Sequence, residues 1–389
     1  MTRPPLLFYC QHSLGLGHLS RSFSLCEALS RAFRVTLVCG GKLPATLKPP
    51  ESVDIVALPP LGAALDGRLI SHDGRRSLER ARELRRSAIL GTFRSVRPEV
   101  ILIEFFPFGK KRFSDELVPL LEEAKRLGPF APLVLCSIRD ILVDRGSEQV
   151  EFDDRASELA NRYFDAVLAH TDPNFARLDE SFRPRVPLRI PTHYTGFVVS
   201  NGKQLNGSEA RSGVVVSAGG GIAGAPLLRA AVAAHRHLED DTRMKVIAGP
   251  FFPEDEWRSL RGEARGRAGL SLRRSVPNLS EEMHRASASV SQCGYNTALD
   301  ILRANVPAMV VPFAEKGEDE QTNRARRLEA LGVVRVLASA DLKAPRFADE
   351  IRALLRFQPR RVRFDLNGAL STVGIVQTIH TERFGSKAS

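Results

Sequence analysis

Short apolar runs alternate with segments of helical spacing along most of the first half of the chain. Runs of this length, bounded by polar or glycine-containing turns, predict strands that are buried on both faces, as in parallel sheets covered by helices. The strands predicted here are Leu6–Cys10, Val35–Val38, Ser52–Leu58, Glu99–Ile103, Leu133–Cys136 and Ala166–Ala169, with helices over Ser20–Ala32 and Gly74–Arg94 and an irregular loop over Pro59–Asp73.

The second half repeats this alternation after a segment rich in glycine, serine and asparagine, Asn201–Gly213, which we interpret as a linker. We therefore predict two doubly wound, Rossmann-like α/β domains that face each other across a cleft, over residues 1–200 and 213–362, with residues 363–389 packing back on the first domain. The strands predicted in this half are Gly213–Ser217, Met244–Ala248, Leu270–Arg273, Ser289–Ser291, Ala308–Val311 and Val333–Leu337.

Composition narrows the class of protein. The 389 residues are 43% hydrophobic and 26% charged, which is typical of a globular protein, and no apolar run approaches the roughly 18 to 20 residues of a membrane span. The apolar run after the N-terminus is too short for a signal peptide, and five cysteines without a Cys-x-x-Cys pair indicate free thiols in a reducing cytoplasm. The net charge of +11 favours an anionic partner, but no nucleic-acid-binding motif accompanies it.

The stretch from residue 288 to 325 predicts a phosphate site. A strand ends at a glycine turn, Gly294, and leads directly into a helix, whose unpaired N–H groups and dipole favour an anion. Asp300 lies three positions after Thr297 and four after Asn296, so these residues share a helix face on which the carboxylate would accept hydrogen bonds from sugar hydroxyls. A later loop supplies two more polar residues before another helix, Glu320 and Gln321.

This order of motifs resembles the donor-binding half of GT-B glycosyltransferases, and most of all the MurG-type N-acetylglucosaminyltransferases and the predicted glycosyltransferases near them. The resemblance rests on the glycine turn, Asn-Thr, the acid on the same helix, Val-Pro-Ala-Met-Val-Val-Pro and Glu-Gln-x-x-Arg-Ala. It implies that Asp300 holds the donor ribose and that Gln321 holds the sugar. The usual acid of the family is Glu, so Asp300 has a side chain one methylene shorter.

The first loop of the chain, Gly-Leu-Gly-His after the first strand, places Gly15, Gly17 and His18 at the carboxyl edge of the predicted sheet. A dinucleotide fingerprint would need a third glycine at Ser20, so we do not expect NAD here. The loop is similar to that of the same glycosyltransferases and also to that of UDP-sugar hydrolases of nonulosonic acid synthesis. His18 is therefore the first candidate for general base.

A second group of candidates follows the strand that ends at Ile103. Glu104 is an alternative general base, and four phenylalanines and three cations follow it within nine residues. The rings would either line a crevice that stacks a sugar or form core beneath a loop. Two later strands also end in polar residues. Arg139 would either face the site or pair with Asp140, and His170 would either line the cleft or cap the next turn. The candidate acceptor contacts are Lys110, Lys111, Arg112, Arg139 and His170.

The helix predicted over Gly74–Arg94 carries seven arginines around a narrow apolar face. It is either a solvated helix packed by one stripe or a surface that meets anionic lipid or a lipid-diphosphate acceptor, as the resemblance implies.

A second glycine loop follows the strand Gly213–Ser217. Gly219, Gly221 and Gly224 fit Gly-x-Gly-x-x-Gly, but the next strand ends in Gly249-Pro250 without the acid that a dinucleotide site requires. The resemblance implies that this loop faces the donor diphosphate and that backbone groups near Val276–Leu279 bind the uracil edge. The resulting donor-site candidates are Gly15, Gly17, Ser217, Gly219, Gly220, Gly221, Val276, Asn278, Leu279, Gly294, Asn296, Thr297, Asp300, Glu320 and Gln321.

The sequence therefore predicts an inverting glycosyltransferase that moves a sugar, N-acetylglucosamine by resemblance, from a UDP-sugar to a hydroxyl or lipid-linked acceptor. We expect no cofactor besides the UDP-sugar substrate and no metal, since the chain has no clustered Asp-x-Asp site. We expect a cytoplasmic protein with peripheral contact to an anionic membrane on its cytoplasmic face. Two alternatives remain open: a UDP-sugar hydrolase that uses His18 and water, and a non-catalytic protein that binds a nucleotide-sugar or lipid.

Overall fold

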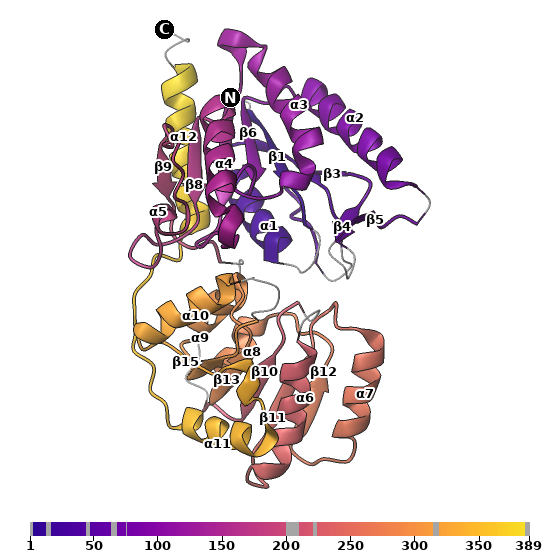
Figure 1. The fold of residues 1–389 in the computed structure, drawn as a ribbon, viewed down its shortest axis with the longest axis vertical. Coiled ribbons are helices and arrows are strands. Elements are labelled where there is room, and N and C mark those ends of the chain that lie inside the picture. The colour runs from indigo at the N-terminus through magenta and orange to yellow at the C-terminus, as the bar shows by residue number, and fades with distance from the viewer. Residues whose placement is uncertain are drawn as a thin grey trace. The chain divides into compact units, whose positions relative to one another are not determined.

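The computed structural model describes residues 3–12, 17–43, 47–63, 68–74, 76–199, 210–220, 224–313 and 319–385. The chain divides into two compact units, the first formed by Met1–Ser200 with Phe364–Ser389 and the second by Asn201–Arg363 (Figure 1). Each unit has its own parallel sheet with helices on both faces, which confirms the predicted α/β fold class.

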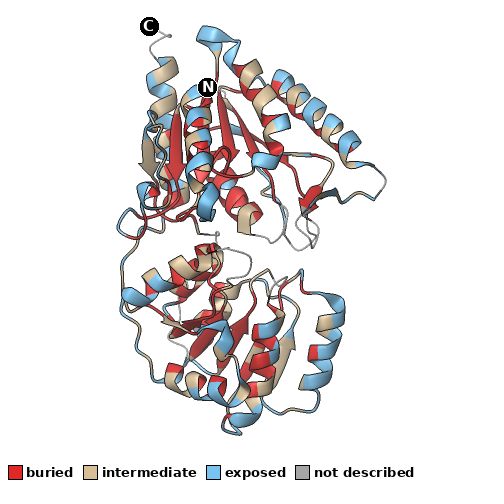
Figure 2. Ribbon diagram, viewed as in Figure 1, coloured by how far each residue is buried: buried red, intermediate tan, exposed pale blue. Residues whose placement is uncertain are grey.

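The first unit is built on a seven-stranded sheet in the order β3-β2-β1-β6-β7-β8-β9, with every neighbouring pair parallel. All five residues of β6 are buried, as expected for a central strand under helices on both sides (Figure 2). The strands are β1 (Pro5–Cys10), β2 (Arg34–Cys39), β3 (Asp54–Ala57), β6 (Val100–Glu104), β7 (Leu133–Ile138), β8 (Ala166–Ala169) and β9 (Thr192–Tyr194).

Helices cover both faces of this sheet (Figure 1). They are α1 (Gly17–Leu29), α2 (Leu78–Val96), α3 (Ser114–Lys125), α4 (Gln149–Tyr163), the short α5 (Leu178–Ser181) and α12 (Gly368–Phe384). The prediction of an irregular loop over Pro59–Asp73 is wrong. The segment contains an antiparallel hairpin of β4 (Leu61–Ala63) and β5 (Leu69–Ser71). The strands of this hairpin have only three residues each, too short for a periodic signal in the sequence.

The C-terminal helix α12 packs in the first unit, where Val373 and Val376 join the core formed by α1, β1 and β2. Two ion pairs hold its last turns, His380 Nε2 to Glu99 Oε2 and Arg383 Nη1 to Asp165 Oδ1, both at 2.7 Å. The last segment of the chain is thus part of the first sheet's outer layer.

The second unit has a six-stranded parallel sheet in the order β12-β11-β10-β13-β14-β15. The order reverses between β10 and β13, and in open α/β sheets such a switch point is where ligands bind, beyond the carboxyl ends of the strands. The strands are β10 (Val214–Ser217), β11 (Met244–Ile247), β12 (Leu270–Arg273), β13 (Ala288–Ser291), β14 (Ala308–Val310) and β15 (Arg335–Val336).

Five of the connecting helices place the polar loops of this unit. They are α6 (Ala225–Ala234), α7 (Glu254–Ala264), α8 (Leu279–Arg285), α9 (Tyr295–Ala304) and α10 (Glu320–Ala330), and α11 (Ala344–Leu355) follows the last strand. Glu320 therefore belongs to the first turn of a helix, one residue earlier than predicted.

In the part of the chain that the structure describes, no helix combines the length and the apolar character that a membrane span requires.

Candidate functional site

His18 and Glu104 meet at the carboxyl edge of the first sheet. Glu104 is the last residue of β6, and His18 lies in the first turn of α1, the helix that follows the neighbouring strand β1. The Nδ1 atom of His18 is 2.8 Å from Oε1 of Glu104. The carboxylate is fully buried, whereas 17% of the histidine side chain is exposed, so only His18 of this pair presents an edge to a ligand.

The electrostatics of the pair favour a neutral imidazole beside a carboxylate. Burial alone would raise the pKa of Glu104, but the charges of His18 and Arg21 outweigh burial and hold its pKa below the ordinary range. Burial lowers the pKa of His18 to about 4, against the opposing effect of Glu104. At neutral pH the imidazole therefore carries one proton, which the bond to Glu104 places on Nδ1, and Nε2 keeps its lone pair.

Three cations surround the pair. Arg21 of α1 donates from Nη2 to Glu104, and Lys110 and Arg139 act on the pKa of His18, which both lower. The pKa of Lys110 is itself lowered by burial. The two neighbouring candidates Lys111 and Arg112 are exposed, on a single turn that follows Lys110. Arg112 accepts from Arg82 through its backbone oxygen.

The phenylalanines after Glu104 are core residues, since Phe105, Phe106, Phe108 and Phe113 are all buried. Of the two interpretations of these rings, the structure supports core beneath a loop. Phe105 also borders the pair: its ring meets His18 edge-on at 6.0 Å between centroids, and the guanidinium of Arg139 lies 5.3 Å from its centre. It has a positive φ of 67°, which is a strained conformation for a bulky residue.

His170 is fully buried and both of its ring nitrogens are bonded within the first unit, so the structure does not support its prediction as an acceptor contact. Its ring is 0% exposed, with Nε2 2.8 Å from Ser137 Oγ and Nδ1 2.8 Å from Thr195 Oγ1. Burial lowers its pKa to about 3, so it is a neutral link between the ends of β7 and β9.

A second buried network lies at the end of β1. Arg85 of α2 is fully buried and donates to both carboxylate oxygens of Glu116 on α3, at 2.7 and 2.5 Å. It also donates to Gln11 Oε1 at 2.7 Å and to Gly40 O at 2.7 Å, and Tyr9 donates to Glu116. Arg85 is thus not one of the solvated arginines that the charge pattern of this helix predicts. It ties the start of the loop between β1 and α1 to two helices.

In the second unit, the glycine turn after β10 lies beside the start of α9. Gly219 has a positive φ of 59°, and a Cβ there would lie 3.5 Å from Thr297 Oγ1. Its N–H donates to Ser217 Oγ at 3.3 Å. Gly294 is the N-cap of α9 and offers no side-chain cap. The structure therefore brings Ser217, Gly219, Gly294 and Thr297 together around a helix N-terminus that suits a phosphate.

Two buried hydroxyls add to the polar character of this edge. Ser289 and Ser291 of β13 are 0% exposed, and their Oγ atoms have no hydrogen-bond partner among the described residues. Ser291 pairs in register with Ser217, so both lie at the switch point of the sheet.

Asp300 lies one turn into α9, half-buried like Asn296, while Thr297 is buried. Burial raises the pKa of Asp300 to about 7, and Arg303 opposes this only in part. Within the described residues, no hydrogen bond or ion pair is made by this carboxylate. Hydrogen bonds from a ligand would stabilise the ionised form of this carboxylate and so lower its pKa.

Gln321 joins two loops of this edge. Its Oε1 accepts from Cys293 N at 3.0 Å and from Phe313 N at 3.2 Å, so the side chain links the turn after β13 to the turn after β14. Its amide nitrogen is the group left to donate to a sugar hydroxyl. Glu320 forms a buried ion pair with Arg324 at 2.6 Å, and Arg324 also donates to Cys293 O at 2.8 Å.

The turn between β12 and α8 is set by Asn278, whose Oδ1 accepts from Glu281 N at 3.2 Å as an N-cap. Val276 and Leu279 pack on the buried residues Val215, Ile247 and Ala286. Val276 and Leu279 therefore help to fix the turn against the sheet, and contact of its backbone groups with a base stays a prediction.

Two of the predicted glycines, Gly15 and Gly221, lie outside the described residues. Gly17 begins α1, and Gly220 lies in the turn after β10.

No group of three or more His, Cys, Asp or Glu side chains in the described ranges is arranged to hold a metal ion. Sequence reasoning missed Arg85 and Tyr9 as site supports, because their partner Glu116 lies on another helix with no local signal.

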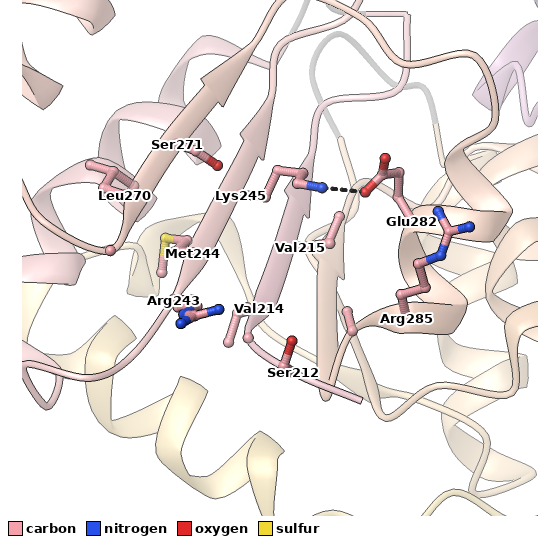
Figure 3. A pocket seen from close by; sticks show the side chains of 13 residues that line it. Ser212, Val214, Val215, Arg243, Met244, Lys245, Leu270, Ser271, Glu282 and Arg285 are labelled. Carbon is pink, nitrogen blue, oxygen red and sulfur yellow. Dashed lines mark hydrogen bonds and ion pairs between the residues drawn. The ribbon is translucent and has the colours of Figure 1, made fainter. Parts of the chain in front are cut away.

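A cavity of about 530 Å³ lies at the other edge of the second sheet, where β10, β11 and β12 begin (Figure 3). Lys245 of β11 points toward Glu282 of α8 across it, at 2.5 Å. The described residues that line it include none of the predicted donor-site residues. The cavity and the candidate donor site are therefore separate.

Two units, each with a parallel sheet covered by helices, are typical of the GT-B fold of glycosyltransferases. Comparison with known proteins agrees. Residues 218–367 match the model of the glycosyltransferase family 28 C-terminal domain.

One curated relative is the UDP-N-acetylglucosamine--N-acetylmuramyl-(pentapeptide) pyrophosphoryl-undecaprenol N-acetylglucosamine transferase of Alkalilimnicola ehrlichii, 30% identical over 100 residues. The match spans 25% of this chain and 28% of that relative.

Solved structures share the fold over nearly the whole chain. The calicheamicin glycosyltransferase CalG4 has a TM-score of 0.63 at 16% identity and covers 99% of both chains. MurG of Acinetobacter baumannii has a TM-score of 0.59 at 13% identity, covering 96% of this chain and 100% of its own. The resemblance to MurG-type GT-B glycosyltransferases is thus confirmed.

Proposed function

We propose that the protein is a glycosyltransferase that moves a sugar, N-acetylglucosamine, from a UDP-sugar to the hydroxyl of a lipid-linked acceptor. The observation that carries this proposal is the hydrogen bond between His18 and Glu104 at the carboxyl edge of the first sheet. The family 28 domain over residues 218–367 supports a nucleotide-sugar donor. The name of the Alkalilimnicola relative supports the sugar and the lipid-linked acceptor.

His18 is the general base in this proposal, and Glu104 positions it. The acceptor hydroxyl donates to Nε2 of His18, and its oxygen attacks the anomeric carbon as the bond to the UDP oxygen breaks, so the configuration inverts. The hydroxyl proton moves to Nε2, and the resulting imidazolium is stabilised by the carboxylate at 2.8 Å. General-base catalysis of this kind contributes about 10² to 10⁴ in rate.

The second unit would bind the donor. The N-terminus of α9 and the glycine turn at Gly219 would receive the diphosphate and stabilise the charge of departing UDP through backbone N–H groups, without a metal or cofactor. Asp300 would accept from the ribose hydroxyls, and Gln321 Nε2 would donate to the sugar. Asn296 and the backbone of the turn at Val276–Leu279 complete the proposed donor contacts, with Lys110 and Arg139 on the acceptor side.

Membrane contact belongs to the same proposal. The turn between α3 and β7 exposes Leu127 and Phe130, with 46% and 81% of the residue accessible, and Lys125 and Arg126 precede them. An apolar tip beside cations suits an anionic lipid surface. We therefore propose a cytoplasmic protein that contacts the cytoplasmic face of the membrane. The exposed arginines of α2 are a weaker candidate, because Arg80, Arg82 and Arg94 already pair with acids.

The test is a panel of nucleotide-sugars, with UDP release followed with and without a membrane lipid extract. The proposal predicts release with one UDP-sugar, dependent on the extract and lost in the variants His18→Ala and Asp300→Ala. Equal release without the extract would establish the UDP-sugar hydrolase instead. UDP binding without turnover in any acceptor would establish the non-catalytic alternative.

A further inference from the structure

Phe251 is an exposed aromatic residue at the carboxyl edge of the second sheet. It follows β11 in a tight turn, and 37% of the residue is accessible. Its backbone N–H donates to Gly220 O at 3.1 Å, so the turn is joined to the glycine loop that follows β10. The turn that carries this exposed aromatic residue is therefore bonded to the loop proposed to bind the donor diphosphate.

The neighbouring strand holds the same turn from the other side. Gly249 N donates to Arg274 O at 2.9 Å, and Arg274 Nη2 donates to Phe252 O at 2.6 Å. The Phe252 side chain is buried in the core and anchors the turn from below. Bonds to the β10 loop and to the end of β12 thus fix the Phe251 backbone before any ligand arrives, which reduces the entropy that binding would cost.

The positions of the other proposed contacts indicate which part of the donor reaches Phe251. The diphosphate site lies at β10 and β13, and Gln321, the proposed sugar contact, joins the loops after β13 and β14. The sugar thus lies on the β14 side of the phosphates. The nucleoside, attached at the other end of the diphosphate, extends to the opposite side, where β11 and β12 follow β10.

We propose that the ring of Phe251 stacks on the nucleobase of the donor. The inference rests on the proposed function and adds a residue that sets nucleotide affinity. The turn at Val276–Leu279, which faces the same part of the edge, supplies only aliphatic and polar side chains, so Phe251 provides the aromatic surface there. Stacking of a base on an aromatic ring depends little on base identity, so Phe251 contributes affinity while backbone groups of the turn select the base.

The experiment is calorimetric titration of the full-length protein with UDP and, separately, with inorganic pyrophosphate. We expect Phe251→Ala to raise the Kd for UDP by about 5- to 150-fold, the range of alanine substitutions at stacked bases, and Phe251→Trp to keep the wild-type Kd. Pyrophosphate binding should be unchanged in both variants. Leu355→Ala is the matched control, because it removes an apolar side chain of similar exposure, 39% of the residue, from the last position of α11 in the same unit.

An unchanged Kd for UDP in Phe251→Ala would overturn the inference. An equal loss of UDP and pyrophosphate binding would also overturn it, because the ring would then act through the shape of the glycine loop. If the wild-type protein binds pyrophosphate but gains nothing from the uridine of UDP, stacking is excluded while an anion site remains. If it binds neither, the proposed function itself fails.

Discussion

The Nδ1 atom of His18 lies 2.8 Å from Oε1 of Glu104, a residue 86 positions away in the chain. The contact assigns different roles to two residues that the sequence could only name as alternative bases. Glu104 is fully buried against Arg21, so no acceptor hydroxyl reaches it, whereas His18 keeps an accessible edge. In the proposed reaction His18 therefore takes the proton, and Glu104 is a positioning residue.

The pH dependence of transfer follows from the pKa of His18. Burial lowers this pKa to about 4, so the imidazole stays unprotonated well below the ordinary value of about 6.5. With the donor held at a saturating concentration, we expect kcat/KM for the acceptor to fall only as the pH approaches about 4. Rate measurements from pH 8 to 4, with circular dichroism to confirm folding at each pH, test this. An acid limb centred near 6.5 would contradict it.

Donor affinity should depend on the ionisation of Asp300. Its pKa is raised to about 7, and ribose hydroxyls bonded to the carboxylate would favour the charged form. We therefore expect UDP-N-acetylglucosamine to bind more tightly above pH 7 than below it. Its diphosphate has no group that titrates in this range, so the effect belongs to the protein. Titrations at several pH values should show this dependence in the wild-type protein and not in Asp300→Asn. A pH-independent wild-type Kd would argue against the ribose contact.

Breaking the network around Arg85 should destabilise the first unit. Arg85→Ala leaves the buried Glu116 carboxylate without its cation, and losses of one partner of a buried pair cost about 3 to 5 kcal/mol. Urea unfolding provides the measurement. Arg80→Ala, on the same helix but in an exposed pair with Glu83, should leave the free energy of unfolding nearly unchanged. Equal effects of the two substitutions would mean that the network contributes no more than a surface pair.

Acid should weaken the fold in part through His170. Burial lowers its folded-state pKa to about 3, whereas the unfolded chain binds a proton near pH 6.5. The unfolded state therefore holds more protons between these values, and stability is lost as the pH falls below about 6.5, by up to about 1.4 kcal/mol per pH unit for one histidine.

In His170→Asn, the free energy of unfolding should depend less steeply on pH between 6 and 4 than in the wild-type protein. The substitution keeps a polar side chain between Ser137 and Thr195. The same slope in both proteins would show that His170 is not held neutral.

Much of the fold was predictable because parallel strands covered on both faces are continuous apolar runs, as in β6 and β8. The ends of helices and strands were harder to predict. The first helix begins at Gly17, three residues before the predicted Ser20, because glycines give no helix signal. The hairpin of β4 and β5 was not predicted, because its strands are too short to show a periodic pattern.

The sequence was enough to name the candidate site residues, but it did not reveal which of them contact one another. Strand ends and glycine turns drew attention to His18, Glu104 and Asp300, since such positions collect ligand contacts in α/β folds. Whether a polar side chain faces a ligand or the core depends on partners far away in the chain. His170 and Arg85 are buried through partners 33 and 31 positions away, which no local pattern reveals.

The most direct test of the account is a double-mutant cycle on the transfer rate. We would measure kcat/KM for wild type, His18→Ala, Glu104→Gln and the double variant with the donor and acceptor found in the nucleotide-sugar panel. Because Glu104 acts through His18, we predict a loss of about 10² to 10⁴ for His18→Ala and no further loss in the double variant. Wild-type activity in His18→Ala, or losses that multiply in the double variant, would contradict the assignment of this pair as the catalytic base and its positioning residue.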